Sequence, residues 1–133
     1  MRLYTEAEAR LLLPHVVPVL EEIRNAFLEL RTLNAAISVE RRGASGDGHL
    51  VADPWEGEQE RGANRIEELG RKLRDDIARL DTWGVELKDP AKGLIDFYHD
   101  RDGEVVYLCF MLGEPDIQYW HTLSGGFAAR SRL

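Results

Sequence analysis

Cysteine is almost missing from this chain of 133 residues, since Cys109 is the only one. No intrachain disulfide can form, which is typical of proteins in a reducing compartment, and we expect a cytoplasmic location. Long hydrophobic runs are missing too, because no apolar stretch approaches the roughly 18 residues of a membrane span. The opening residues MRLYTEAEAR lack the apolar core and cleavage site of a signal peptide. We therefore expect no membrane as a partner.

Basic residues are outnumbered, with 17 Lys and Arg against 24 Asp and Glu and a net charge of −7. Nonspecific binding of nucleic acids depends on Lys and Arg that neutralise phosphates, so we expect no nucleic-acid partner. The chain also has no Glu followed three residues later by His, a motif that di-iron carboxylate bundles require. That class of metalloprotein is excluded.

A long amphipathic helix is predicted over residues 5–41. Thr5 and Glu8 have the spacing of a capping box at its start. Hydrophobic residues then recur at alternating spacings of three and four, interrupted by Asn34: Leu13, Val16, Leu20, Ile23, Phe27, Leu30 and Ile37. This heptad pattern is typical of a coiled-coil-like seam. Pro14 and Pro18 favour a kink, or a separate first helix.

A second helix is predicted over residues 54–83, after a glycine-rich flexible loop at 42–52. Asp53 and Pro54 suit its N-cap and first position, and Gly84 suits its C-terminal stop. The seam continues through Trp55, Gln59, Gly62, Ile66, Leu69, Leu73, Asp76 and Leu80. A lone antiparallel hairpin leaves both seams half covered, so we expect a homodimer, the C-terminal segment, or both to complete them. The polar seam residues Asn34, Gln59 and Asp76 are expected at its solvent edge; alternatively, Asn34 sets the register of a dimer.

An antiparallel β-meander of three or four strands is predicted over residues 85–123, where the hydrophobic period changes to two. Asp102-Gly103 is a strong signal for a two-residue hairpin turn. In that register one face is apolar and suits packing against the helices: Ile95, Phe97, His99, Val106, Leu108, Phe110 and Leu112. The chain is thus an α+β protein, and we expect a single domain over 1–133 with a tail at 124–133.

The second turn decides which residues join the mixed, aromatic face of the sheet. Glu114-Pro115-Asp116 suits a β-turn, and a two-residue loop there pairs Met111 with Trp120 and Phe110 with His121. This register separates Cys109 from His121, which argues against a shared nucleophile or metal site. Cys109 is then expected to be buried and inert, and His121 to be a hydrogen-bonded residue at the edge of the helix–sheet core. An odd loop or a bulge would instead unite the two residues.

The mixed face is the expected contact surface. Its residues are Asp96, Tyr98, Tyr107, Cys109, Met111, Gln118 and Trp120. Aromatic patches of this kind usually mark an interface. The tail, through Phe127, or a second copy is expected to cover it, and a small-molecule site is a further alternative.

Several stretches resemble the pattern of the bacterial domain-of-unknown-function family 2203. They are YTEAEARLLLPHVVPVLEEI, GVELKDPAKGLIDF, GEVVYLCFMLGEPDIQYWH and GFAAR, and the resemblance covers nearly the whole chain except the loop around 42–52. The resemblance implies a small bacterial cytosolic protein with a helical hairpin and a β-rich C-terminal segment. It implies no activity and no catalytic residues.

Two functional hypotheses remain open. The first is a non-enzymatic interaction module that self-associates through its helical seams and needs no cofactor. The second is an enzyme that binds a small molecule or a divalent metal, with Asp96, Glu114, His121 and Arg130 as its polar residues. In that case Asp or Glu acts as acid or base, Glu114 and His121 are the metal ligands, and Arg130 binds an anion.

Overall fold

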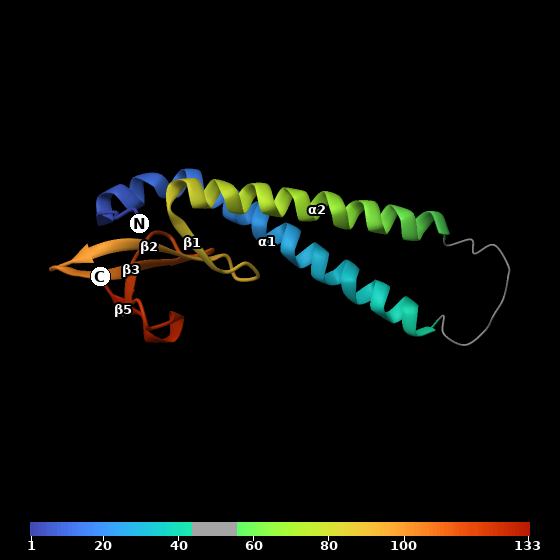
Figure 1. Ribbon diagram of the computed structural model, residues 1–133. Helices are drawn as coiled ribbons and strands as arrows, with labels where there is room; N and C mark the ends of the chain where they lie inside the picture. The colour runs from blue at the N-terminus through green and yellow to red at the C-terminus, as the bar shows by residue number, and fades with distance from the viewer. Residues whose placement is uncertain (44–55) are drawn as a thin grey trace.

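The computed structural model describes residues 1–43 and 56–133 of the protein. Helices α1 (Glu6–Gly43) and α2 (Glu56–Trp83) form a long hairpin that extends from one end of a five-stranded antiparallel sheet (Figure 1). The strands lie in chain order: β1 (Val85–Asp89), β2 (Leu94–Arg101), β3 (Glu104–Met111), β4 (Tyr119–Thr122) and β5 (Ser131–Arg132). A 3-10 turn, η1 (Phe127–Ala129), precedes β5. The α+β class is confirmed, with five strands rather than three or four because the tail supplies β5.

The start of α1 is held by the predicted capping box. The Glu8 amide donates to Thr5 Oγ1 at 3.1 Å, and the Thr5 amide donates to Glu8 Oε1 at 3.0 Å. Pro14 and Pro18 both lie inside one continuous helix, so the alternative of a separate first helix is wrong. Both prolines are exposed, so the backbone bonds that they remove lie on the solvent side of the helix rather than against the core.

Helix α2 ends as predicted, at Trp83. Gly84 follows with a positive φ of 71°, and its amide donates to the Asp81 carbonyl at 2.9 Å. Helix α1 runs to Gly43, two residues further than expected. The remainder of the predicted loop and the Asp53-Pro54 cap lie outside the described residues.

The hydrophobic core lies between one face of the sheet and the adjoining halves of the two helices. Its members are buried side chains from the two helices, from β1 to β3 and from the connection before β4: Ala9, Leu13, Val16, Val19, Leu20, Ile23, Leu80, Val85, Ile95, Phe97, Leu108, Phe110 and Ile117. Tyr4 joins them and packs edge-on against Phe97 at 5.3 Å between ring centroids. The C-terminal sheet therefore covers the inner part of the helical seams, which was one of the two expected ways to complete them.

The polar seam positions do not behave alike. Asn34 is exposed, as expected for the solvent edge of the seam. Asp76 is only 5% exposed, so the expectation that it touches water is wrong. Its position faces α1 and the Glu22 carboxyl, and the helix–helix contact removes it from solvent. Gln59 falls outside the described side chains.

The first β-hairpin has the predicted register. Arg101 pairs with Glu104, and the ladder continues through Phe97 with Leu108. Asp102 and Gly103 have positive φ values of 53° and 89°, as a two-residue hairpin turn of this type requires. The apolar face of β2 and β3 accordingly packs against the helices.

The second β-hairpin has a different register from the predicted one. Cys109 pairs with Tyr119 and Tyr107 with His121. The connection between the paired residues, 110–118, therefore contains an odd number of residues. The chain turns early, at Gly113, where φ is 102°. Ile117 is then fully buried in the core, and its carbonyl accepts from Arg10 of α1 at 3.0 Å. This anchor lengthens the connection and reverses which side chains of β4 face the helices.

None of the helices that the structure describes is both long enough and apolar enough to cross a membrane.

Candidate functional site

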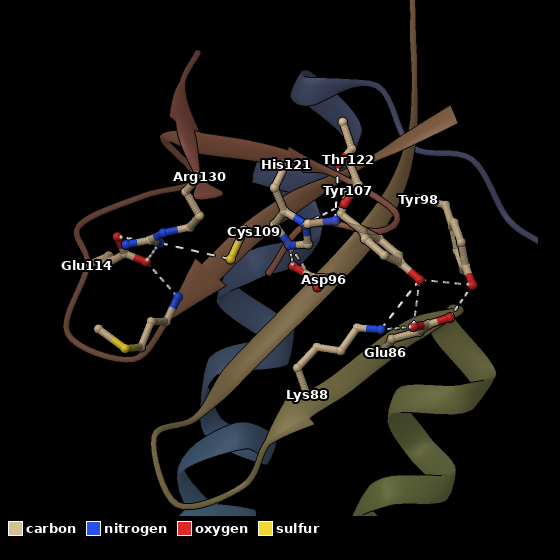
Figure 2. A network of polar contacts seen from close by, with 12 residues as sticks. Glu86, Lys88, Asp96, Tyr98, Tyr107, Cys109, Glu114, His121, Thr122 and Arg130 are labelled. Atoms are coloured by element: carbon tan, nitrogen blue, oxygen red, sulfur yellow. Dashed lines mark hydrogen bonds and ion pairs between the residues drawn. The ribbon is translucent and has the colours of Figure 1, made fainter. Parts of the chain in front are cut away.

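The sheet face that points away from the helices carries polar side chains from four strands. Because side chains alternate along a strand, the observed pairing places these residues on that face: Glu86 and Lys88 of β1, Asp96 and Tyr98 of β2, Tyr107 and Cys109 of β3, and Tyr119 and His121 of β4. We call this the tail-facing face, because residues 123–130 lie across it. Figure 2 shows most of these polar side chains close together, with the hydrogen bonds and ion pairs that they make.

Asp96, Cys109 and His121 form a compact buried cluster at the centre of this face. One donor atom from each residue lies within 4.8 Å of the other two. The side chains come from three neighbouring strands, and all three residues are at most 4% exposed. A carboxylate, a thiol and an imidazole are thus held together in a buried position.

The orientation of His121 is set by two hydrogen-bond partners. Its Nδ1 lies 2.8 Å from the Thr122 carbonyl, and its Nε2 lies 3.0 and 3.1 Å from the two Asp96 carboxyl oxygens (Figure 2). A carbonyl can only accept, so Nδ1 carries a hydrogen. The close approach of Nε2 to a carboxylate requires a positive charge between the two groups, either a proton or a metal cation.

Cys109 is buried as predicted, but it lies against charged groups. Burial, with Asp96 next in effect, raises the pKa of the Cys109 thiol to about 12. The Arg130 Nη1 atom lies 3.9 Å from the sulfur and acts in the opposite direction. Burial likewise raises the pKa of Asp96, against the effect of its contacts with His121 and Cys109.

Arg130 ties the tail to this cluster. Its Nη1 donates to both carboxylate oxygens of Glu114 at 3.0 Å, and the two side chains are only 12% and 13% exposed. The guanidinium also stacks between the rings of Tyr119 and Phe127, 4.1 and 4.0 Å from their centroids. Glu114 in turn accepts from the Met111 amide at 2.6 Å. The tail is therefore held by an enclosed ion pair rather than by loose surface contacts.

A second polar group surrounds Glu86 beside the cluster. Its carboxylate accepts from Lys88 at 2.6 Å, from Tyr107 at 3.0 Å and from Tyr98. Burial raises the pKa of Glu86, but these hydrogen bonds together have the larger effect, so the pKa lies below its usual value. The Lys88 ammonium also lies 4.5 Å from the centroid of the Tyr107 ring. The ring of Tyr107 packs against that of His121 at 5.3 Å and so connects the two groups.

A cavity of about 130 Å³ lies between the tail-facing face and the tail. Its wall from the sheet side consists of Lys88, Leu94, Asp96, Tyr107 and His121, and its wall from the tail consists of Leu123, Gly125, Gly126 and Phe127. The expectation that the tail folds back over the face is confirmed. The described tail leaves a small space directly over the carboxylate and the imidazole.

The predicted contact surface is only partly correct. Asp96, Tyr98, Tyr107, Cys109 and Met111 share the tail-facing face, but the odd-length connection turns Gln118 and Trp120 to the other side. Trp120 instead packs at the edge of the hydrophobic core. His121 was expected on that side, and it lies on the tail-facing face.

The predicted register placed Asp96 and His121 on opposite faces of the sheet, and that placement is wrong. Asp96 is paired with His121, and Glu114 is paired with Arg130. The Glu114 carboxylate, which the alternative named as a metal ligand beside His121, is paired with Arg130 in the structure. Sequence reasoning missed the grouping of Asp96, Cys109 and His121, and the signal that could have indicated it was Gly113 as an early turn.

The fold and this face define an α+β protein whose sheet has a helical hairpin on one side and a buried carboxylate–thiol–imidazole cluster on the other. A family model described as "Uncharacterized conserved protein (DUF2203)" matches residues 2–133. The chain belongs to that family, as the resemblance of its motifs implied. No curated protein and no solved structure matches the chain.

Proposed function

We propose that the protein binds a transition-metal ion, with zinc as the preferred metal, through Asp96, Cys109 and His121. One observation carries the proposal: three metal-binding donor types lie within 4.8 Å of one another, all buried. Thiolate, imidazole and carboxylate are the donors that zinc takes in proteins. The mixture of sulfur, nitrogen and oxygen disfavours magnesium and calcium, which prefer oxygen alone.

The hydrogen bond of His121 supports the same proposal. A metal-bound histidine usually donates the N–H of its other ring nitrogen to a carbonyl or carboxylate. This hydrogen bond fixes the ring and leaves the first nitrogen free for the metal. The Nδ1 contact with the Thr122 carbonyl at 2.8 Å has this geometry. A cation beside Nε2 would also neutralise the buried Asp96 carboxylate and convert the Cys109 thiol to thiolate, because a coordinating thiol loses its proton.

The rival chemistry of a nucleophilic cysteine fits the geometry less well. In such a site the imidazole contacts the sulfur, and a third group orients the imidazole from its other nitrogen. Here both ring nitrogens of His121 face oxygens, of Thr122 and Asp96. The raised pKa of Cys109 likewise differs from that of activated thiols, which is depressed.

Metal content and cobalt spectroscopy test the proposal. The protein is purified under reducing conditions, stripped with a chelator and titrated with Zn²⁺ or Co²⁺. We expect one metal ion per chain and, for cobalt, a thiolate-to-metal charge-transfer band. The band should vanish in Cys109→Ser, and binding should weaken by about tenfold or more in His121→Ala.

His15→Ala is the matched control, since His15 is exposed on α1 and the cluster lies on the sheet face that points away from the helices. It should bind cobalt as the wild type does. A folded wild-type protein that binds neither metal, or a Cys109→Ser variant that keeps the charge-transfer band, would contradict the proposal. A circular dichroism spectrum of each variant separates loss of the site from loss of the fold.

Self-association through the helices is the second candidate function. Its support is the outer part of α1, where Leu30, Leu33 and Ile37 are only half-buried, whereas Val16, Leu20 and Ile23 beside the sheet are fully buried. A second copy that packs its own hairpin there would complete the seam as a homodimer. Light scattering tests this: we expect twice the monomer mass, and Leu33→Glu should reduce it to the monomer mass. A wild-type monomer at micromolar concentration would contradict it.

A bacterial cytoplasm suits both candidates and is part of the proposal. A buried thiol that binds metal must stay reduced, and the cytoplasm maintains that state. Expression of the chain in a cytoplasmic and in a periplasmic form, followed by metal analysis of each, would show which compartment loads the site.

A further inference from the structure

We infer that the proposed metal keeps one coordination position open toward the cavity under the tail, and that this position takes a short-chain carboxylate whose second oxygen contacts Lys88. The inference rests on the proposed metal site and extends it from metal binding to ligand binding. The metal centre would then bind and release a small molecule as well as stabilise the fold.

The number of protein donors supports an open position. Among the residues that the structure describes, only Asp96, Cys109 and His121 offer donor atoms to the cluster. Structural zinc sites have four protein ligands, whereas sites with three protein ligands bind water or substrate in the fourth position. Two of the three donors, Asp96 and His121, line the cavity, while Cys109 does not. A metal held by all three would therefore lie at the floor of the cavity, with its free direction toward the tail.

The size of the cavity restricts the ligand. A volume of about 130 Å³ corresponds to roughly four water molecules at ~30 Å³ each. Drug-sized ligands and nucleotides need several hundred Å³. Acetate and propionate have the right bulk, and the side chains of Leu94, Leu123 and Phe127 provide apolar walls for a short hydrocarbon chain.

Lys88 provides a positively charged contact for an anion in the cavity. Lys88 is the one cationic side chain of the lining, and its ammonium is already oriented by Glu86 at 2.6 Å and by the Tyr107 hydroxyl at 3.4 Å. A metal charge of +2 would be balanced by the Asp96 carboxylate and the Cys109 thiolate. One carboxylate oxygen bound to the metal and the other near Lys88 would use both positive groups of the cavity.

The roof over this position is part of the folded chain. The Gly125 amide donates to the Thr122 carbonyl and to its hydroxyl, both at 3.1 Å. Phe127 is held by its contact with the Arg130 guanidinium at 4.0 Å. The same segment that gives the cavity its apolar wall is thus fixed to the sheet, which limits the length of ligand that fits.

The experiment uses the cobalt-loaded full chain, whose visible spectrum reports the coordination of the metal. Azide, acetate, propionate and benzoate are each titrated, with azide as a small anion that tests the open position alone. We expect saturable spectral changes with azide, acetate and propionate, and much weaker binding of benzoate because its ring exceeds the cavity. Lys88→Met should weaken acetate binding about tenfold and leave cobalt loading unchanged.

Lys72→Met is the matched control, because Lys72 is exposed on α2 and is not part of the cavity wall. It should bind acetate like the wild type. A cobalt spectrum with its thiolate band that does not respond to azide or acetate would overturn the inference while leaving the metal site intact. Equal acetate affinity of the wild type and Lys88→Met would overturn the assigned role of Lys88. Failure to load cobalt at all would instead count against the proposed function.

Discussion

The two faces of the sheet are both buried at their centres, but different interactions close them. The helix-facing side is closed by hydrocarbon, with Phe97 and Leu108 fully buried against the helical hairpin. The tail-facing side is closed by hydrogen bonds and an ion pair, with Asp96 and His121 at 1% and 4% exposure and Arg130 tying down the tail. Hydrophobic burial is non-directional and tolerates small shifts, whereas buried polar groups need each partner in place. The helix-facing side can therefore stabilise the fold, and the tail-facing side can hold functional groups in fixed positions.

The two buried aspartates show the same contrast on a smaller scale. Both carboxyl oxygens of Asp96 face the Nε2 atom of His121. Among the side chains that the structure describes, Asp76 Oδ2 has no hydrogen-bond partner, and Asp76 lies near the like-charged Glu22. We therefore expect Asp96 to serve the site and Asp76 to reduce stability.

Phe97→Ala should be the most damaging change, because it opens the centre of the helix-facing side. Deletion of a fully buried phenylalanine typically costs about 3–5 kcal/mol of unfolding free energy. Urea denaturation measures this loss. Leu11→Ala is the control: Leu11 is 77% exposed, so its loss should change stability by less than about 0.5 kcal/mol. If Phe97→Ala lowered the unfolding free energy only slightly, the tail-facing side rather than the helix-facing side would contribute most of the stability.

Arg130→Met should remove the ion pair that holds the tail against the sheet, while the methionine keeps most of the hydrocarbon of the arginine side chain. It leaves the enclosed Glu114 carboxylate without its partner, which should cost about 2 kcal/mol. Limited proteolysis should then cut the tail near Phe127 faster than in the wild type. The double variant Glu114→Gln/Arg130→Met should recover part of the stability, because it no longer buries a lone charge.

Arg132→Met is the matched control for this change, since Arg132 is exposed in β5. Its stability and cleavage rate should equal those of the wild type. If the double variant were as unstable as the sum of its single changes, Glu114 and Arg130 would not act as a pair.

Asp76→Asn should have a smaller and opposite effect, a gain in stability at neutral pH. Burial, and then the interaction with Glu22, raises the pKa of Asp76 to about 6 from 3.8. The folded state therefore binds the proton more tightly than the unfolded state. The stabilisation from protonated Asp76 is complete below about pH 4 and is lost as the pH rises through about 6. The variant should exceed the wild type at pH 7 by on the order of 2 kcal/mol.

Urea titrations at pH 4, 5, 6 and 7 check this prediction, since the difference between the two proteins should grow with pH. Asp75→Asn is the control, because Asp75 is the exposed neighbour on the same helix. A difference that stays constant across this range would show that Asp76 has an ordinary pKa in the folded protein.

Local patterns accounted for most of the architecture. The capping box at Thr5, the stop at Gly84 and the Asp102-Gly103 turn each depend on residues within a few positions of one another, and each is present as predicted. The hydrophobic period likewise identified both helices and the helix-facing side of β2 and β3. These features could be predicted because short-range geometry and side-chain alternation decide them.

The site could not be predicted in the same way. Its three donors come from β2, β3 and β4, and the parity of one connection decides whether His121 meets Cys109. Glu114-Pro115-Asp116 suits a two-residue turn, and the prediction followed that local signal. The actual connection is longer because Ile117 gains more by full burial in the core, with its carbonyl bound by Arg10, than a tight turn would provide.

The sequence by itself determined the two helices, the first hairpin and the side of the sheet that the helices cover, because apolar periodicity and turn residues act over short distances. Only the tertiary structure decided the rest. Contact between α1 and Ile117 set the register of β4, and that register brought His121 to Asp96 and Cys109. The return of Arg130 to Glu114 then closed the tail over them. A packing choice on the hydrophobic side of the sheet thus created the polar cluster on its other side.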